Sequence, residues 1–311
     1  ALRARALWEQ IGTEAPEIGF RPDGSLTLAQ RPEEMAVLEQ VVARADASAR
    51  GFQLLDRAEV LAVNPALRGA YLGGLLCTAD AVVEPRLALP ALRSLLLRQS
   101  GYAFVGGRTA TAIEAGSVTD HTGDRHGADV VVVCPGAERQ GPVAELVDGE
   151  PVRPVRLQMM QTAPLGERLT TSVADGDSLR YYPAFRVPAL DALPPQEPVA
   201  AEHHMQLLIS QRATGELTVG DTHAYDEPFD FAAAEAPYAH LHERAASLLG
   251  RPLPPVERRW TGVYSQALDE AICLRREVVP GVWLVTGPGG RGMTLSPAIA
   301  EETLSQIGSP A

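Results

Sequence analysis

Apolar and polar residues repeat with two different periods along the chain, and these periods predict where helices and strands lie. Apolar residues that recur every three or four positions predict helices over residues 1–11, 32–50, 56–61, 86–99 and 232–249. Alternating or short continuous apolar runs predict strands over residues 24–30, 102–105, 110–114, 128–134, 152–160, 178–182, 204–211, 216–221, 256–264, 273–276 and 282–286. Helices and strands mixed in this way predict an α/β fold.

Two kinds of strand pattern indicate two kinds of sheet. Residues 128–134 are apolar without alternation, which is typical of a parallel strand covered on both faces, and Pro135, Gly136 and Ala137 follow. From Pro151 onward the strands alternate, and residues 204–211 and 216–221 are spaced as a hairpin. We therefore expect parallel elements on both sides of an antiparallel insert.

A glycine-rich loop follows the last predicted strand. Glycines stand at positions 287, 289, 290 and 292, between the strand at 282–286 and an apolar-periodic segment at 298–307. Glycine permits positive φ and close approach of the backbone to a ligand, and free N–H groups at a helix start favour negative charge. The pattern suits a flat, polar-edged or anionic ligand, although ordinary turn glycines before a helix remain the alternative.

Charge and cysteine content narrow the classes of function. The 311 residues carry a formal charge of −12 without a basic run, which argues against binding to nucleic acid or an anionic membrane surface. No apolar stretch approaches the ~20 residues of a membrane span. Cys77, Cys134 and Cys273 lie far apart in apolar surroundings, so we expect buried, reduced thiols without a metal, in a cytoplasmic protein. Residues 1–11 lack a cap and an initiator Met, so we also expect missing N-terminal residues.

Several segments together resemble one known family. They are Val83 and Pro85 before a helix, Gly101, the run at 128–137, residues 154–158, residues 260–262 and the terminal glycine loop. With these segments the chain resembles the D-amino-acid oxidase superfamily of FAD-dependent amine oxidoreductases, which includes glycine oxidase and sarcosine oxidase. Gln211, residues 215–223, Tyr225, residues 259–264 and residues 289–294 resemble a branch associated with phosphonate catabolism.

The resemblance implies a Rossmann-like FAD/NAD(P)-binding domain and an α+β substrate domain built on an antiparallel sheet. The FAD domain would comprise residues 1–15, 80–148 and 275–311, and the substrate domain residues 16–79 and 149–274. The family's first strand and helix, with their G-x-G-x-x-G fingerprint for the pyrophosphate, would precede Ala1, so the FAD domain would be incomplete.

The resemblance also implies site residues. For the cofactor they are Ala110 beside the adenine, the turn at Gly136 and Ala137, and the loop along the flavin ring, namely Gly287, Gly289, Gly290, Arg291, Gly292, Met293 and Thr294. The candidate catalytic or substrate-binding residues are Arg291, Tyr264, Tyr182, His204 and His223, with Arg180 or Arg259 as further positive charges. A solvated arginine, core tyrosines and structural histidines remain the alternatives. Adjacent His203 and His204 on a strand would face opposite ways, so we expect no metal.

The implied reaction is hydride transfer from the carbon beside an amine to flavin N5, which gives an imine and then an aldehyde. The substrate would be a small anionic amine, an aminoalkylphosphonate or its N-methylated form, and oxygen or another acceptor would reoxidise the flavin. A glycine, sarcosine or D-amino-acid oxidase or dehydrogenase is one alternative, and a cofactor-free fragment or non-enzymatic binding protein is another. Asp221, His223, Ser210 and Ser265 do not predict a hydrolase, because no G-x-S-x-G elbow accompanies them.

Overall fold

The computed structural model describes residues 1–308 and divides them into two compact units. Unit 1 comprises residues 1–15, 90–155 and those from 263 onward, and unit 2 comprises Pro16–Leu89 and Arg156–Gly262. Which unit holds a cofactor and which a substrate stays a prediction at this point.

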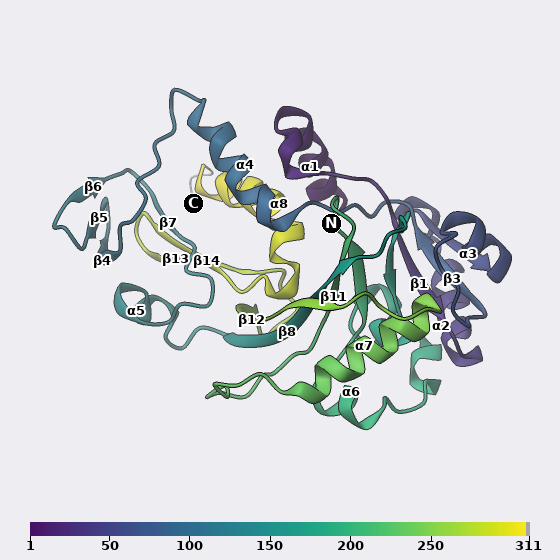
Figure 1. Cartoon of the computed structure of the whole chain (residues 1–311). Helices are drawn as coiled ribbons and strands as arrows, with labels where there is room; N and C mark the ends of the chain where they lie inside the picture. Colours follow the sequence, from purple (N-terminus) through teal and green to yellow (C-terminus); the bar gives the residue numbers. More distant parts are fainter. Residues whose placement is uncertain (309–311) are drawn as a thin grey trace. The chain divides into compact units, whose positions relative to one another are not determined.

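Unit 1 contains two small sheets and the two ends of the described chain (Figure 1). One sheet has the order β13-β14-β7 and the other β4-β5-β6. Its elements are α1 (Leu2–Glu14), β4 (Ala110–Glu114), β5 (Ser117–Asp120), β6 (Arg125–Gly127), β7 (Val131–Val133), α5 (Ala144–Val147), β13 (Leu274–Val279), β14 (Val282–Thr286) and α8 (Gly292–Ile307). Helix α4 (Pro85–Leu97) passes from unit 2 into unit 1.

The β13-β14-β7 sheet contains one parallel and one antiparallel pair. Strand β14 runs parallel to β7, with Val282 opposite Val131 and Leu284 opposite Val133, whereas β13 is antiparallel to β14. These four side chains are buried in the core of unit 1. The parallel pair places the residues that follow β7 and β14 at the same edge of the sheet.

One face of β7 is exposed within the described residues. Val131 and Val133 are buried, but Val130 is 37% exposed to solvent and Val132 is 42% exposed. The prediction that this strand is covered on both faces is therefore wrong for residues 1–308, because no described element packs on the second face.

Unit 2 is built on a large mixed sheet whose strand order is β12-β8-β11-β10-β9-β1-β3-β2. The pairs from β2 to β8 are antiparallel except for the parallel pair of β1 and β9. The strands are β1 (Ser25–Ala29), β2 (Phe52–Asp56), β3 (Gly73–Cys77), β8 (Val152–Pro164), β9 (Ser172–Ala174), β10 (Leu208–Gln211), β11 (Glu216–Gly220) and β12 (Val256–Ala267), of which β8 and β12 continue into unit 1. The fold is thus α/β.

Four helices accompany this sheet: α2 (Pro32–Val42), α3 (Arg57–Val63), α6 (Pro198–Glu202) and α7 (Glu235–Leu249). Helix α7 buries Tyr238, Leu241, Ala245 and Leu248, which share one helical face, in the larger core of unit 2. The helix ends at Gly250, whose φ of +68° gives the left-handed turn that closes many helices. None of the helices within residues 1–308 is long and apolar enough to cross a membrane.

Four predicted elements differ in the structure. Residues 102–105 form no strand; Phe104 instead lies under the Arg93 guanidinium, 4.9 Å from its ring centroid. Residues 176–180 form a 3-10 helix rather than a strand, because the Asp175 side chain accepts from the Asp177 N–H and caps that turn. The helix predicted to end at residue 50 ends at Val42. The strand predicted from residue 204 begins at Leu208.

The cysteines also differ from expectation. All three are free thiols, but Cys134 is exposed and Cys77 and Cys273 are half-buried. Partial burial still raises the pKa of the Cys77 thiol to about 12. The prediction of fully buried thiols is therefore wrong, because each cysteine lies at or beyond a strand end rather than within a strand's covered part.

Candidate functional site

In unit 1, two glycine turns meet at the carboxyl ends of β7 and β14. Gly136 and Gly287 both have positive φ, +63° and +75°. The Thr286 hydroxyl donates a hydrogen bond to the Gly136 carbonyl oxygen at 3.0 Å and joins the two turns. In α/β proteins ligands bind beyond the carboxyl ends of parallel strands, so this edge is a candidate site.

The loop after β14 needs glycine for two physical reasons. Gly289 has a φ of +64°, and a Cβ at Gly287 would lie 3.0 Å from both the Ala267 nitrogen and Val152 Cγ1. Gly287, Gly289 and Gly292 also have the G-x-G-x-x-G spacing between a strand and a helix. The loop therefore presents backbone atoms to its surroundings instead of side chains.

Helix α8 begins directly after this loop. No side chain caps the helix, and its first N–H, that of Gly292, donates to the Gly289 carbonyl oxygen of the preceding 3-10 turn, so it is the positive end of the helix that favours an anion or a polar ligand edge. The Trp8 indole N–H on α1 lies 3.2 Å from the carbonyl oxygens of both Met293 and Thr294 and holds the first turn in place. The Arg291 guanidinium, half-buried at the N-cap, has no hydrogen-bond or ion-pair partner among residues 1–308.

Strand β12 backs the loop. The Ala267 N–H donates to the Gly287 carbonyl at 2.9 Å, and Gln266 Cγ would lie 3.4 Å from a Cβ at Gly289. Tyr264 lies two residues before Gln266 and therefore points to the same face of the strand. The Gln266 Oε1 is buried and has no hydrogen-bond partner within the described chain, so an acceptor is available beside the loop.

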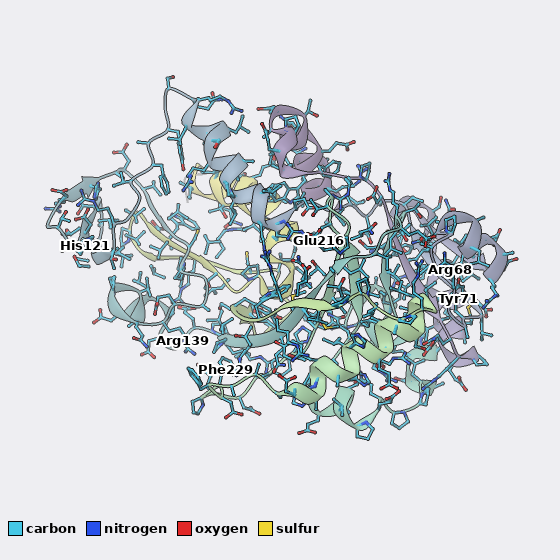
Figure 2. The ribbon with its side chains drawn as sticks, in the orientation of Figure 1. Arg68, Tyr71, His121, Arg139, Glu216 and Phe229 are labelled. Carbon is cyan, nitrogen blue, oxygen red and sulfur yellow. The ribbon has the colours of Figure 1, made fainter. Side chains whose placement is uncertain are left out.

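The adenine-side candidate, Ala110, lies on another element of unit 1. Ala110 is the first residue of β4 and pairs with Asp120 of β5. His121, labelled in Figure 2, follows β5, and its Nδ1 accepts from the Thr109 N–H at 3.1 Å. Ala137 is half-buried directly after Gly136. No contact of Ala110 with the glycine loop supports its adenine role, which stays a prediction.

In unit 2, a polar pocket of about 170 Å³ collects residues that are far apart in the sequence. The loop between β11 and α7, where Figure 2 labels Phe229, contributes part of its wall. Its lining is Arg156, Gln158, Glu202, His203, His204, Thr222, His223, Ala224, Tyr225 and Asp226. Two predicted residues, His204 and His223, thus belong to one site.

His223 lies inside an aromatic cluster. Its ring, 1% exposed, stacks on Tyr181 with the centroids 4.9 Å apart, and Tyr225 lies 6.2 Å away on a nearly parallel plane. Tyr182 meets Tyr181 edge to face at 5.1 Å, and the His204 ring lies 5.1 Å from Tyr225. The structure therefore brings Tyr182, His204 and His223 together.

The local conformation of His203 and His204 corrects one prediction. His203 is the C-cap of α6, and His204 has a positive φ of +46°, so neither lies on a strand. The alternation rule that placed them on opposite faces does not apply, and both line the pocket. Among the described residues no group of three His, Cys, Asp or Glu side chains is arranged to hold a metal ion.

Asp221 is a functional candidate that sequence reasoning missed. Its Oδ2 lies 4.0 Å from His223 Nε2, and its Oδ1 accepts from the Gln206 amide at 3.3 Å. Burial raises the pKa of the Asp221 carboxyl, an effect that His223 opposes. The i, i+2 spacing of Asp221 and His223 was visible, but only the fold shows that the two side chains approach each other.

The further arginine candidates already have partners. Arg259 binds Glu235 at 2.5 Å and lies over the Tyr238 ring, while Arg180 pairs with Asp177 at 3.6 Å. Within residues 1–308, Arg291 is therefore the predicted anion anchor whose charge is not balanced by an acidic neighbour. In sum, unit 1 holds the glycine loop, Gly136, Ala137, Tyr264 and Arg291, and unit 2 holds the aromatic pocket.

Comparisons with known proteins agree with this description. Residues 1–306 match the family model described as DAO, FAD dependent oxidoreductase. Glycine oxidase from Geobacillus kaustophilus is 20% identical, with a TM-score of 0.74 over 100% of this chain and 79% of that chain. L-proline dehydrogenase from P. horikoshii is 17% identical, with a TM-score of 0.77 over 98% and 77% of the two chains.

Iminodiacetate oxidase from Chelativorans sp. BNC1 is 19% identical, with a TM-score of 0.72 over 99% and 80% of the two chains. At these identities the solved structures show a shared fold. No curated protein sequence matches significantly.

Proposed function

Because the chain belongs to the DAO family of FAD-dependent oxidoreductases, an enzyme family whose cofactor is FAD, we propose that it oxidises the C–N bond of a small anionic amine. The proposed substrate is an aminoalkylphosphonate or its N-methylated form. Unit 1 would hold FAD, unit 2 would contribute substrate-binding residues, and the proposed location is the cytoplasm.

The residues of unit 1 fit a flavin. The glycine loop excludes side chains by positive φ and by the close neighbours of Gly287, so a flat ring can approach its backbone. A Cβ at Gly136 would meet nothing within 4 Å, which leaves open space beside the second turn. Gln266 Oε1 adds an unused acceptor, a partner for a ring N–H. These features support the proposed cofactor residues Gly136, Ala137 and 287–294.

FAD, when bound, supplies at N5 the acceptor for the hydride that leaves the carbon beside the amine. The chain's own residues would position the substrate and stabilise charge. The positive end of α8, which no side chain caps, would favour the negative charge of a reduced ring. The imine product would hydrolyse to an aldehyde, and oxygen or another acceptor would take the electrons.

The single observation that carries the substrate class is Arg291. A half-buried guanidinium without an acidic partner, at the positive end of a helix, is suited to bind a carboxylate or phosphonate in two hydrogen bonds. Glycine, sarcosine or a D-amino acid carries the same kind of anionic group, so an amino-acid oxidase or dehydrogenase is the second candidate. The names of the structural relatives, which act on glycine, proline and iminodiacetate, favour a small amine that carries an anion.

A panel of amines tests the proposal. The FAD-loaded protein is mixed without oxygen with 2-aminoethylphosphonate, its N-methyl form, sarcosine, glycine and neutral propylamine, and absorbance near the flavin maximum is followed. We expect one phosphonate to bleach the flavin fastest and propylamine slowest. Faster bleaching by sarcosine or glycine would select the amino-acid alternative, and no bleaching by any amine would reject amine oxidation.

A further inference from the structure

The hydrogen bond of His223 fixes which ring nitrogen carries its proton. Nδ1 lies 3.0 Å from the His204 carbonyl oxygen. A carbonyl oxygen can only accept, so Nδ1 must donate and carries the hydrogen. In the neutral ring the other nitrogen, Nε2, therefore holds a lone pair and is a proton acceptor.

Aromatic packing keeps the ring in this orientation. Tyr181 stacks on one side at 4.9 Å with an interplanar angle of 27°, and the Tyr225 ring lies 6.2 Å away at 18°. Because the side chain is 1% exposed, turning the ring would break both its stacking and its hydrogen bond. Nε2 is thus held in a fixed place 4.0 Å from the Asp221 carboxylate, on a residue that lines the pocket.

Asp221 lies close enough to act on the charge of Nε2. Its Oδ2 is 4.0 Å from Nε2, too long for a hydrogen bond but short for an ionic attraction. The Gln206 amide holds the other carboxylate oxygen at 3.3 Å, and Gln206 is itself 4% exposed. The carboxylate is therefore positioned from a second side.

The remaining charged groups of the pocket favour a cationic ligand. Glu202 and Asp226 line it and have no ion-pair partner within residues 1–308. Arg156 donates one hydrogen bond from each terminal nitrogen to the Asp230 and Ala232 carbonyl oxygens, so backbone acceptors take part of its donor capacity. His203 and His204 complete the titratable lining. The carboxylates of Glu202 and Asp226 match the ammonium end of the proposed substrate.

We propose that His223 Nε2 accepts the proton of a substrate ammonium group and that Asp221 is the positioning residue that stabilises the resulting imidazolium. In this step the N–H bond of the ammonium breaks, the proton binds Nε2, and the amine keeps the electron pair. The inference rests on the proposed function, because hydride can leave the adjacent carbon only when the amine nitrogen is neutral. It adds a base and its partner to that function.

Histidine NMR tests the pair without the flavin reaction. The protein is labelled with 15N in its histidine rings, and the His223 signals are assigned by loss in His223→Gln. We expect the Nδ1–H form in the neutral ring. We expect Asp221→Asn to lower the His223 titration midpoint, because it removes the carboxylate charge 4.0 Å from Nε2. Asp191→Asn, at an exposed carboxylate of unit 2, is the matched control and should leave the midpoint in place.

An Nε2–H tautomer, or equal midpoints in Asp221→Asn and Asp191→Asn, would overturn the proposal. These readouts hold even if no amine reduces the flavin, an outcome that would reject the proposed function alone.

The pH profile of flavin reduction gives the kinetic test. Without oxygen, His223→Gln should slow reduction about 100-fold at pH 7 and less at pH 10, where a much larger fraction of the amine is already neutral. Asp221→Asn should shift the pH at which the reduction rate falls on the acidic side of the profile, whereas Asp191→Asn should not. Both residues would have only a structural role if His223→Gln lowered the reduction rate equally at every pH and Asp221→Asn left the low-pH side of the rate profile unchanged.

Discussion

The candidate site of unit 1 is made of backbone, whereas that of unit 2 is made of side chains. In unit 1, positive-φ glycines and an uncapped helix start present N–H groups, and Arg291 is the one predicted charge at the loop. In unit 2, imidazole, phenol and carboxylate groups from several loops surround one pocket. The first site suits a planar cofactor that brings its own chemistry, and the second suits proton handling on a small ligand.

The apolar cores of the two units also differ, and unit 2 has the larger one. Unit 2 buries a large apolar cluster around its sheet, including Leu217 at 0% exposure. Unit 1 has a smaller cluster and leaves Val132, Leu268 and Leu304 exposed within the described residues. Unit 2 should therefore contribute most of the stability that the described chain has.

Truncating one leucine in each unit should produce the largest difference in the free energy of unfolding. Leu217→Ala leaves a cavity in a closed core and should lower the free energy of unfolding by about 2 to 5 kcal/mol. Leu268→Ala, at a side chain 59% exposed, should change it by less than about 0.5 kcal/mol. Urea unfolding followed by circular dichroism measures both, and equal losses would contradict the contrast between the interiors.

The buried Asp175 should make the stability of unit 2 depend on pH. Burial and the neighbouring Asp177 raise the pKa of its carboxyl to about 6, above the ordinary value of 3.8. The native state therefore binds the proton more tightly, so this contribution is complete below about pH 4 and is lost as pH rises through 6.

Asp175→Asn should accordingly cost more stability at pH 4 than at pH 7, by about 2 to 3 kcal/mol. The measurement is urea unfolding of both proteins at the two pH values. A cost that is equal at both, or larger at pH 7, would show that the carboxyl is not held protonated.

Adding one methyl group to the glycine loop should weaken FAD binding. Gly289→Ala places a Cβ at a φ of +64° and 3.4 Å from Gln266 Cγ, which strains the loop, and we expect the Kd for FAD to rise about 10- to 100-fold. Gly123→Ala is the matched control: its φ is +87°, and its Cβ meets nothing within 4 Å. Flavin fluorescence titration measures both, and equal Kd values would remove the loop from the FAD site.

Arg291→Met should change KM for an anionic substrate more than KM for a neutral one. Losing two charge-assisted hydrogen bonds should raise KM for a phosphonate about 10-fold and leave KM for propylamine nearly unchanged. Steady-state oxidation assays on the two substrates provide the comparison. An equal rise in both values would show that Arg291 shapes the loop instead of binding the anion.

The backbone-made site was the easier one to predict. Gly287, Gly289 and Gly292 lie within one short segment, and the strand before them and the helix after them follow from local periodicity. Parallel elements on both sides of an antiparallel insert were also expected, but the pairing of β14 with β7 was not predicted. The sequence could not show that one face of β7 is exposed within the described residues, as it is at Val132.

The side-chain pocket could not be predicted as a whole. His204, His223 and Tyr182 were named singly, but their meeting depends on a 3-10 turn where a strand was expected and on a positive φ at His204. Asp221 gained its role only when the structure placed its carboxylate 4.0 Å from His223. Contacts between distant segments carry no local signal in a single sequence.

The most direct test of the central claim is a visible absorption spectrum of the purified protein after incubation with FAD and removal of unbound cofactor. If unit 1 forms a flavin site, the protein keeps a yellow chromophore whose maxima are shifted from those of free FAD, and Gly289→Ala loses it. A wild-type protein that stays colourless at saturating FAD would contradict the account.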